Sequence, residues 1–212
     1  MKFSSCSLIA GIVFVAATPC FAEKNAKLKP ALVAPGNVVL KDAFSAKALG
    51  KRWAVNKGAF EIVNGVVAGR EKTTDKHAAV LTCKVPNRNS AIRFSFKLGT
   101  TKAFHLSFNK KRGHLFRVIV TRNGIVLRTD KANRKSKTKP VVLAKSANKV
   151  AADQWYTMLV EVRRNDVAVQ VDNGTTLTGS HSSLDVDKPN YRFIVRGKTF
   201  RLDDVTIWTA KP

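Results

Sequence analysis

The stretch from Asn89 to Arg128 alternates apolar and polar residues with a period of two, and this pattern restricts the fold more than any other feature. Successive side chains of a β-strand face opposite sides of a sheet, so this period places one side in a core and the other in solvent. The stretch therefore predicts four short strands joined by tight turns. The side chains expected in the core are Ile92, Phe94, Phe96, Leu98, Phe104, Leu106, Phe108, Phe116, Val118 and Val120.

The opposite side of these strands is polar and basic. The alternation predicts one shared outer face that carries Arg93, Ser95, His105, Ser107, Asn109 and Arg117 side by side. Such a face is either a solvated sheet surface or a binding surface. We select four of its members as candidate ligand-binding residues, namely Arg93, His105, Asn109 and Arg117.

The rest of the chain repeats the same design. Asn64-Gly65, Asn123-Gly124, Asn165-Asp166 and Asn173-Gly174 separate further alternating segments, and Asn-Gly pairs favour two-residue hairpin turns. No long amphipathic helix is predicted. We expect an all-β fold, an antiparallel β-sandwich of about ten to fourteen strands in which the last strand pairs near the first, as in jelly rolls.

The N-terminus has the features of a secretory signal peptide over residues 1–22. Lys2 provides the positive start, Leu8 to Ala17 is a short apolar core, and small residues precede Glu23. We expect a flexible, Lys- and Pro-rich lead-in over residues 23–37 and one β-sandwich domain over residues 38–212. The protein is therefore expected to be periplasmic or secreted, with no membrane span.

The formal net charge of +24 attracts polyanions. Removing Lys2, the sole charged residue of the predicted signal peptide, would leave +23. Outside the cytoplasm the available polyanions include sulfated and uronic polysaccharides, so we expect a glycan or another polyanion as partner rather than a specific nucleic acid. A charge that serves only solubility is the alternative. A monomer is expected.

Cysteine and histidine chemistry finds little support in the sequence. Cys83 alone remains after removal of Cys6 and Cys20, so no intramolecular disulfide is possible, and its apolar surroundings predict a small buried side chain. His77, His105, His114 and His181 lack the spacings of metal ligands. We expect no metal and no cofactor.

Three segments resemble secreted concanavalin A-like jelly rolls, in particular the 3-keto-disaccharide hydrolase domain family. They are Asp42-Ala-Phe44 with Trp53 and the Phe60–Gly69 hairpin, Asp153-Gln-Trp155-Tyr156, and Phe200–Ile207. The resemblance implies a concanavalin A-like fold and a glycan-related role. Most of these residues have a packing explanation, since Trp53, Phe60 and Trp155 are large enough to fill a core.

The sequence leaves an enzyme and a binding domain both open. Glycoside hydrolysis uses two carboxylates across the bond, and the candidates are Glu61, Glu71, Asp75, Glu161 and Asp172. Glu161 is the best placed of these, although a charge partner for Arg163 is the simpler role. His105 beside cationic residues is a candidate base for a lyase. A glycan-binding domain requires less, because the arginines of the outer face suit flat anions.

Overall fold

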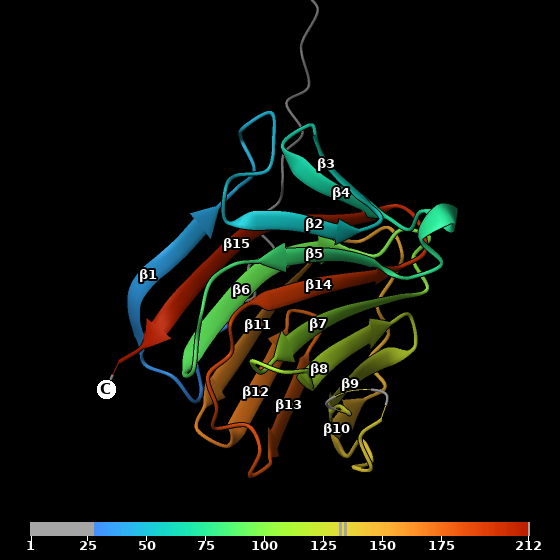
Figure 1. Cartoon of the computed structure of the whole chain (residues 1–212). Helices are drawn as coiled ribbons and strands as arrows, with labels where there is room; N and C mark the ends of the chain where they lie inside the picture. Colours follow the sequence, from blue (N-terminus) through green and yellow to red (C-terminus); the bar gives the residue numbers. More distant parts are fainter. Residues whose placement is uncertain (1–27, 132, 134, 212) are drawn as a thin grey trace, which may run out of the picture.

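The computed structural model describes residues 28–131, 133 and 135–211, which form fifteen strands and one short 3-10 helix, η1 (Thr73–Asp75) (Figure 1). The predicted signal peptide lies outside the described residues. No helix in the described part of the chain is long and apolar enough to cross a membrane.

The strands form two antiparallel sheets packed face to face. Sheet A has the order β13 (Thr175–Ser180), β12 (Asp166–Val171), β11 (Tyr156–Arg163), β6 (Ser90–Lys97), β15 (Phe200–Ala210), β4 (Val66–Arg70) and β3 (Ala59–Val63), and β1 (Pro35–Asp42) also pairs with β15. Sheet B has the order β10 (Val142–Ser146), β9 (Gly124–Thr129), β8 (His114–Thr121), β7 (Ala103–Asn109), β14 (Tyr191–Arg196), β5 (Ala79–Cys83) and β2 (Trp53–Lys57).

The predicted fold class is confirmed. The last strand, β15, pairs with the first, β1, along a register that runs from Pro35 opposite Ala210 to Asp42 opposite Val205. The chain is thus an antiparallel β-sandwich with the jelly-roll closure expected from the sequence.

The core lies between the sheets and consists of the apolar sides of the alternating strands. Phe94 of sheet A packs edge-on against Phe104 and Phe193 of sheet B, with ring centroids 5.8 and 5.4 Å apart. Trp53 and Phe60 are buried as predicted. Trp155 is only half-buried and lies outside the core, so its predicted role as a core filler is wrong.

One carboxylate connects the two parts of the opening motif, the Asp42-Ala-Phe44 segment and Trp53. Asp42 accepts hydrogen bonds from the main-chain N–H of Phe44 at 2.9 Å and from the indole N–H of Trp53 at 2.8 Å. Phe44 is buried and has a positive φ of 49°. The Asp-x-Phe and Trp elements therefore have a structural role at the start of the domain.

Of the four predicted turns, one agrees with the sequence, two shift by one residue, and one is a residue longer than predicted. Asn64-Gly65 connects β3 and β4 with φ angles of 52° and 76°, as a type I′ turn requires. Two loops are Arg122-Asn123 and Arg164-Asn165, because Thr121 pairs with Gly124 and Arg163 with Asp166. The fourth is the three-residue loop Asp172-Asn173-Gly174, because Val171 pairs with Thr175.

The four strands expected to be neighbours in one sheet are divided between two. β6 belongs to sheet A, whereas β7, β8 and β9 belong to sheet B. The link from Leu98 to Lys102 therefore crosses from one layer to the other. A period of two is the same in either layer, which is why the pattern did not reveal this crossing.

The N-terminal lead-in differs from the prediction. β1 already begins at Pro35, and Val33 is buried. The main-chain N–H groups of residues 31–33 bind the side chain of Glu161, which lies on the outer face of sheet A. A buried carboxylate that finds three main-chain donors fixes this segment, so residues 28–37 belong to the folded domain.

Candidate functional site

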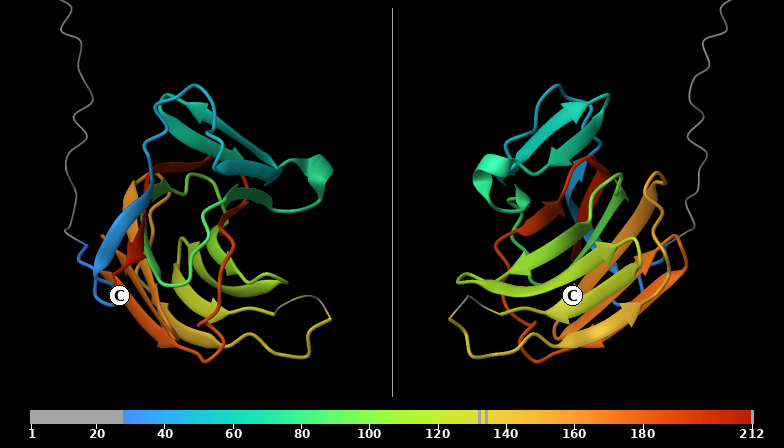
Figure 2. Two further views of the ribbon diagram at one scale, coloured as in Figure 1. Left: turned by 60° about the vertical axis from the view of Figure 1, so that its left-hand side comes forward. Right: turned by 90° about the vertical axis from the view of Figure 1, so that its right-hand side faces the viewer.

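The outer face of sheet B collects polar side chains from five adjacent strands. In the left view of Figure 2, η1 and the loop that follows β9 project on the same side of this sheet, above and below it. His105 and Asn109 of β7 and Arg117 of β8 lie on this face, opposite to the core side of their strands.

Arg93 does not lie with them. It is on β6, on the outer face of sheet A, where its guanidinium carbon is 5.9 Å from the ring centre of Trp208. The predicted shared face of Arg93, His105, Asn109 and Arg117 is therefore wrong for Arg93, because the chain crosses between the layers after β6.

The strand register builds a row of cross-strand neighbours on this face. Arg192 pairs with Ser107, Ser107 with Arg117, and Arg117 with Arg128. Neighbouring strands are separated by about 4.8 Å. We call Arg192, Ser107, Arg117 and Arg128 the arginine row. On the β5 side, Thr82 continues it.

Arg117 is held by partners on two sides. Its Nη1 lies 3.2 Å from Nδ1 of His105, and its Nη2 pairs with the carboxylate of Asp130. Arg128 also approaches Asp130, at 3.5 Å. A single carboxylate thus serves two arginines. Asp130 follows Arg128 by two residues, so the alternation places both side chains on the same outer face. The sequence therefore contains a signal for Asp130, although Asp130 was not among the predicted site residues.

His105 is neutral in this setting. Burial, assisted by the positive charges of Arg117, Arg196 and Arg128, lowers the pKa of His105 to about 3. An arginine has only donors, so the Nδ1 atom of His105 accepts from Arg117 and the ring proton is on Nε2. The lone pair that a base would use is therefore occupied, and His105 positions the guanidinium of Arg117.

The arginine row contains buried polar atoms that have no hydrogen-bond partner within the part of the chain that the structure describes. They are the hydroxyl of Ser107 and the Nε atoms of Arg117, Arg128 and Arg192. Buried donors without a partner are rare in folded proteins, because each loses its bond to water. These atoms lie below the surface, while the Arg117 and Arg128 side chains stay 14% and 34% exposed, so the row presents the outer ends of its guanidinium groups on the face.

The neighbouring row on the same face is apolar. Ile194 and Ile119 flank His105 across the strands, and Val80 and Val126 extend the row. The face therefore offers charged donors in one line and hydrocarbon in the next. None of the outward positions of β7, β8, β9 and β14 holds Phe, Tyr or Trp.

Asn109 is used within the protein. Its side chain is buried, with Oδ1 2.9 Å from His114 Nδ1 and Nδ2 3.4 Å from Asn190 Oδ1. It lies at the end of the face and connects β7, β8 and the segment before β14. The structure thus gives Asn109 a bridging role next to the row, instead of a free ligand-binding amide.

Three of the five candidate carboxylates from the sequence have partners within the protein and lie on different elements, β11, β3 and η1. Glu161 is fully buried on sheet A and accepts from residues 31–33, Glu61 forms an exposed pair with Arg70 at 3.7 Å, and Asp75 accepts from the N–H of Gly58. The weak catalytic candidates Glu161 and His105 lie on opposite sheets. No group of three or more potential metal ligands occurs among the residues that the structure describes.

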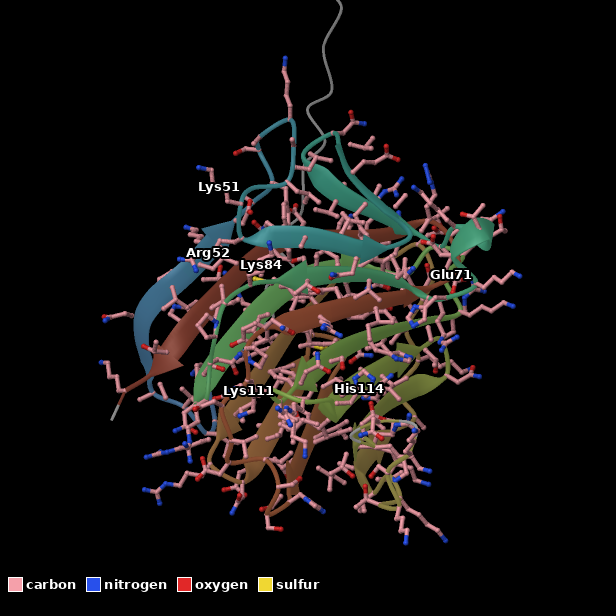
Figure 3. All side chains as sticks on the ribbon, viewed as in Figure 1. Lys51, Arg52, Glu71, Lys84, Lys111 and His114 are labelled. Carbon is pink, nitrogen blue, oxygen red and sulfur yellow. The ribbon has the colours of Figure 1, made fainter. Side chains whose placement is uncertain are left out.

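Figure 3 looks onto the sheet B face with all described side chains drawn. Arg52 and Lys84 lie together by β2 and β5, where the N–H of Lys84 donates to the carbonyl of Arg52 at 2.7 Å. Lys111 and His114 lie near the connection of β7 and β8. Basic side chains thus lie by β2 and β5 and near the β7–β8 connection, Glu71 lies beside η1, and Asp130 is the carboxylate that contacts the arginine row.

Known structures share this fold. A galectin-like protein of unknown function from Bacillus subtilis aligns with a TM-score of 0.64 at 13% identity, over 84% of this chain and 98% of that one. The carbohydrate binding module CBM66 from Bacillus subtilis aligns with a TM-score of 0.61 at 12% identity, over 74% and 95%. LamA from Z. galactanivorans, solved with laminaritriose and laminaritetraose, gives 0.60 at 10%, over 82% and 100%.

These similarities show that the chain has a jelly-roll β-sandwich fold, which it shares with a galectin-like protein and a carbohydrate binding module. No family model matches the chain, and no curated protein matches its sequence. The specific resemblance to the 3-keto-disaccharide hydrolase domain family is not confirmed.

Proposed function

We propose that the chain binds a glycan with anionic groups through the outer face of sheet B. The observation that carries this proposal is the arginine row, in which the strand register gathers three arginines on one face beside a single contacting carboxylate, Asp130. Guanidinium groups bind carboxylates and sulfates through parallel hydrogen bonds, so an anionic chain suits the outer ends of these arginines.

The composition of the face favours an anionic ligand over a neutral one. The three arginines of the row face one carboxylate, Asp130, which contacts Arg117 and Arg128, so the row keeps an excess of positive charge. Neutral glycans are often bound on exposed aromatic rings, which the outward positions of β7, β8, β9 and β14 lack. The apolar row beside the arginines provides contact for the hydrocarbon part of a sugar ring.

Two further considerations support a glycan as the ligand. The structural neighbours include a carbohydrate binding module and a complex with laminari-oligosaccharides. The predicted signal peptide over residues 1–22 would export the chain to the compartment where such polysaccharides occur. The proposal therefore includes a location outside the cytoplasm.

A glycan array of neutral, uronic and sulfated chains tests the proposal with residues 23–212 at low and moderate salt. We expect selective binding of one anionic class that persists at moderate salt. Arg192→Ala should weaken it about tenfold, since an arginine–anion contact is worth about 1.5 kcal/mol. Arg93→Ala is the matched control, because it removes the same charge from sheet A and should leave binding unchanged.

Two results would contradict the proposal. Equal losses in Arg192→Ala and Arg93→Ala would mean that net charge alone attracts the ligand. Binding of every polyanion that disappears at moderate salt would mean the same, because exposed charges are screened over about 8–10 Å.

A further inference from the structure

A pocket of about 460 Å³ lies at the end of sheet B where β8 begins and β9 ends. It is closed from the other layer by His181 and Ser183, which follow β13 of sheet A. Its volume falls within the range of small-ligand pockets. Asp130 belongs both to this pocket and to the surroundings of the arginine row, so the two are contiguous.

The two histidines of the pocket present opposite hydrogen-bonding groups. His114 Nδ1 is 2.9 Å from Asn109 Oδ1, an acceptor, so this nitrogen donates and Nε2 is left as an acceptor. Burial and the charge of Arg117 lower the pKa of His114, which favours the neutral ring. His181 Nδ1 accepts from the main-chain N–H of Ser183 at 3.2 Å, so its Nε2 carries the proton and donates.

The other lining residues also combine donors with acceptors. Asp130 adds a carboxylate whose side chain is only 8% exposed, while Lys110 and Lys139 add ammonium donors. Leu115 and Val141 provide an apolar wall. A sulfate or carboxylate only accepts hydrogen bonds, so it cannot donate to Nε2 of His114 or to Asp130. A sugar hydroxyl donates and accepts at once, and a sugar ring has an apolar side as well.

We propose that this pocket binds a neutral sugar unit through its hydroxyl groups, beside the arginine row that binds anionic units. The inference rests on the proposed function for the statement that the ligand is a glycan. It adds that the glycan contains both neutral and anionic units, and that they are bound by two different sets of residues that meet at Asp130.

Nuclear magnetic resonance titration of residues 23–212 with free neutral sugars tests the inference. The probes are methyl glycosides of glucose, galactose and mannose, and free fructose, with sodium sulfate as the anionic probe. We expect at least one sugar to shift the ring signals of His114 and His181 saturably, to the same extent at low and moderate salt. Sulfate should not produce this shift.

Variants connect the signal to the pocket. Ser183 is exposed, so Ser183→Ala should keep the fold. Its hydroxyl lies 2.8 Å from His181 Nδ1, and the substitution removes this contact. Both Ser183→Ala and His181→Ala should weaken sugar binding up to about tenfold, the loss expected for one hydrogen bond. Arg192→Ala should leave it unchanged. The inference is overturned if no sugar shifts these signals, or if sulfate displaces the sugar.

The two proposals fail in different ways. If neutral sugars do not bind while an anionic chain still binds in an Arg192-dependent manner, the pocket inference alone is wrong. If neutral sugars shift His114 and His181 while no anionic chain depends on Arg192, the pocket inference holds and the proposed function of the arginine row is wrong.

Discussion

The main-chain N–H of Val33 donates a hydrogen bond of 2.9 Å to the Oε1 atom of Glu161, a residue 128 positions later in the chain. The same carboxylate accepts from Ala31 and Leu32 at 2.9–3.0 Å. Arg163 and Gln170 donate to the carbonyls of Leu32 and Lys29. Glu161, the strongest catalytic candidate of the sequence, thus fixes the N-terminal segment to sheet A.

Glu161→Gln should loosen this segment without changing its shape. The amide keeps one acceptor and loses the negative charge, so we expect the free energy of unfolding to fall by about 1–3 kcal/mol. Urea unfolding measures the loss, and amide hydrogen exchange at residues 31–33 should accelerate. Glu61→Gln is the control, because Glu61 is exposed and should have no measurable effect. Equal stability of the two variants would refute the anchoring role.

His105 should make the protein less stable as the pH falls below about 6.5. The pKa of His105 is about 3 in the folded state and about 6.5 when unfolded, so the unfolded chain takes up the proton first. Its contribution is complete above pH 6.5 and decreases through the window down to about pH 3.

The measurement compares the wild type with His105→Gln, which does not titrate but can accept from Arg117. Between pH 7 and pH 5 the wild type should lose about 2 kcal/mol more in urea unfolding than the variant. The nearby His114 is present in both proteins and cancels. Parallel pH profiles would show that His105 is not held neutral.

Asp130→Asn should affect the two proposed ligands in opposite directions. The variant removes the negative charge shared by Arg117 and Arg128, so a sulfated chain should bind more tightly. It also replaces one of the two acceptor oxygens of Asp130 in the pocket with a donating amide, so a neutral sugar should bind more weakly. Isothermal titration calorimetry at one fixed salt concentration measures both.

A control for this variant separates the local from the global effect of charge. Asp187→Asn removes one negative charge at an exposed position and should change neither affinity appreciably. Thermal unfolding monitors the fold, because loss of a buried ion-pair partner costs about 3 kcal/mol. A decrease in both affinities of folded Asp130→Asn would contradict the prediction.

Cys83 should resist thiol reagents until the protein unfolds. It is fully buried, and burial raises the pKa of its thiol to about 12. The thiolate is the reactive form, so labelling at pH 8 should be at least about a thousandfold slower than for a free cysteine. The rate is measured on residues 23–212, whose sole cysteine is Cys83, with and without urea. Rapid labelling without denaturant would be inconsistent with the packing.

Much of the fold followed from local rules. The alternation around Phe94, Phe104 and Phe116 identified the buried sides of the strands, Asn64-Gly65 identified a turn, and the apolar surroundings of Cys83 indicated its burial. These features depend on the geometry of a strand or a turn and on the hydrophobicity of its residues. They need no knowledge of which strands become neighbours.

The tertiary structure decided which residues form a site. Alternation assigns a side chain to the inner or outer side of its strand, but both sheets have an outer side, so it did not separate Arg93 on sheet A from Arg117 on sheet B. The partners of Arg117 and Glu161 depend on the strand order and on the crossing between the layers after β6. Neither changes the period-two alternation, so the alternation did not predict these partners. The sequence by itself determined the strands and their buried sides, and long-range pairing alone brought Arg192, Arg117 and Asp130 together.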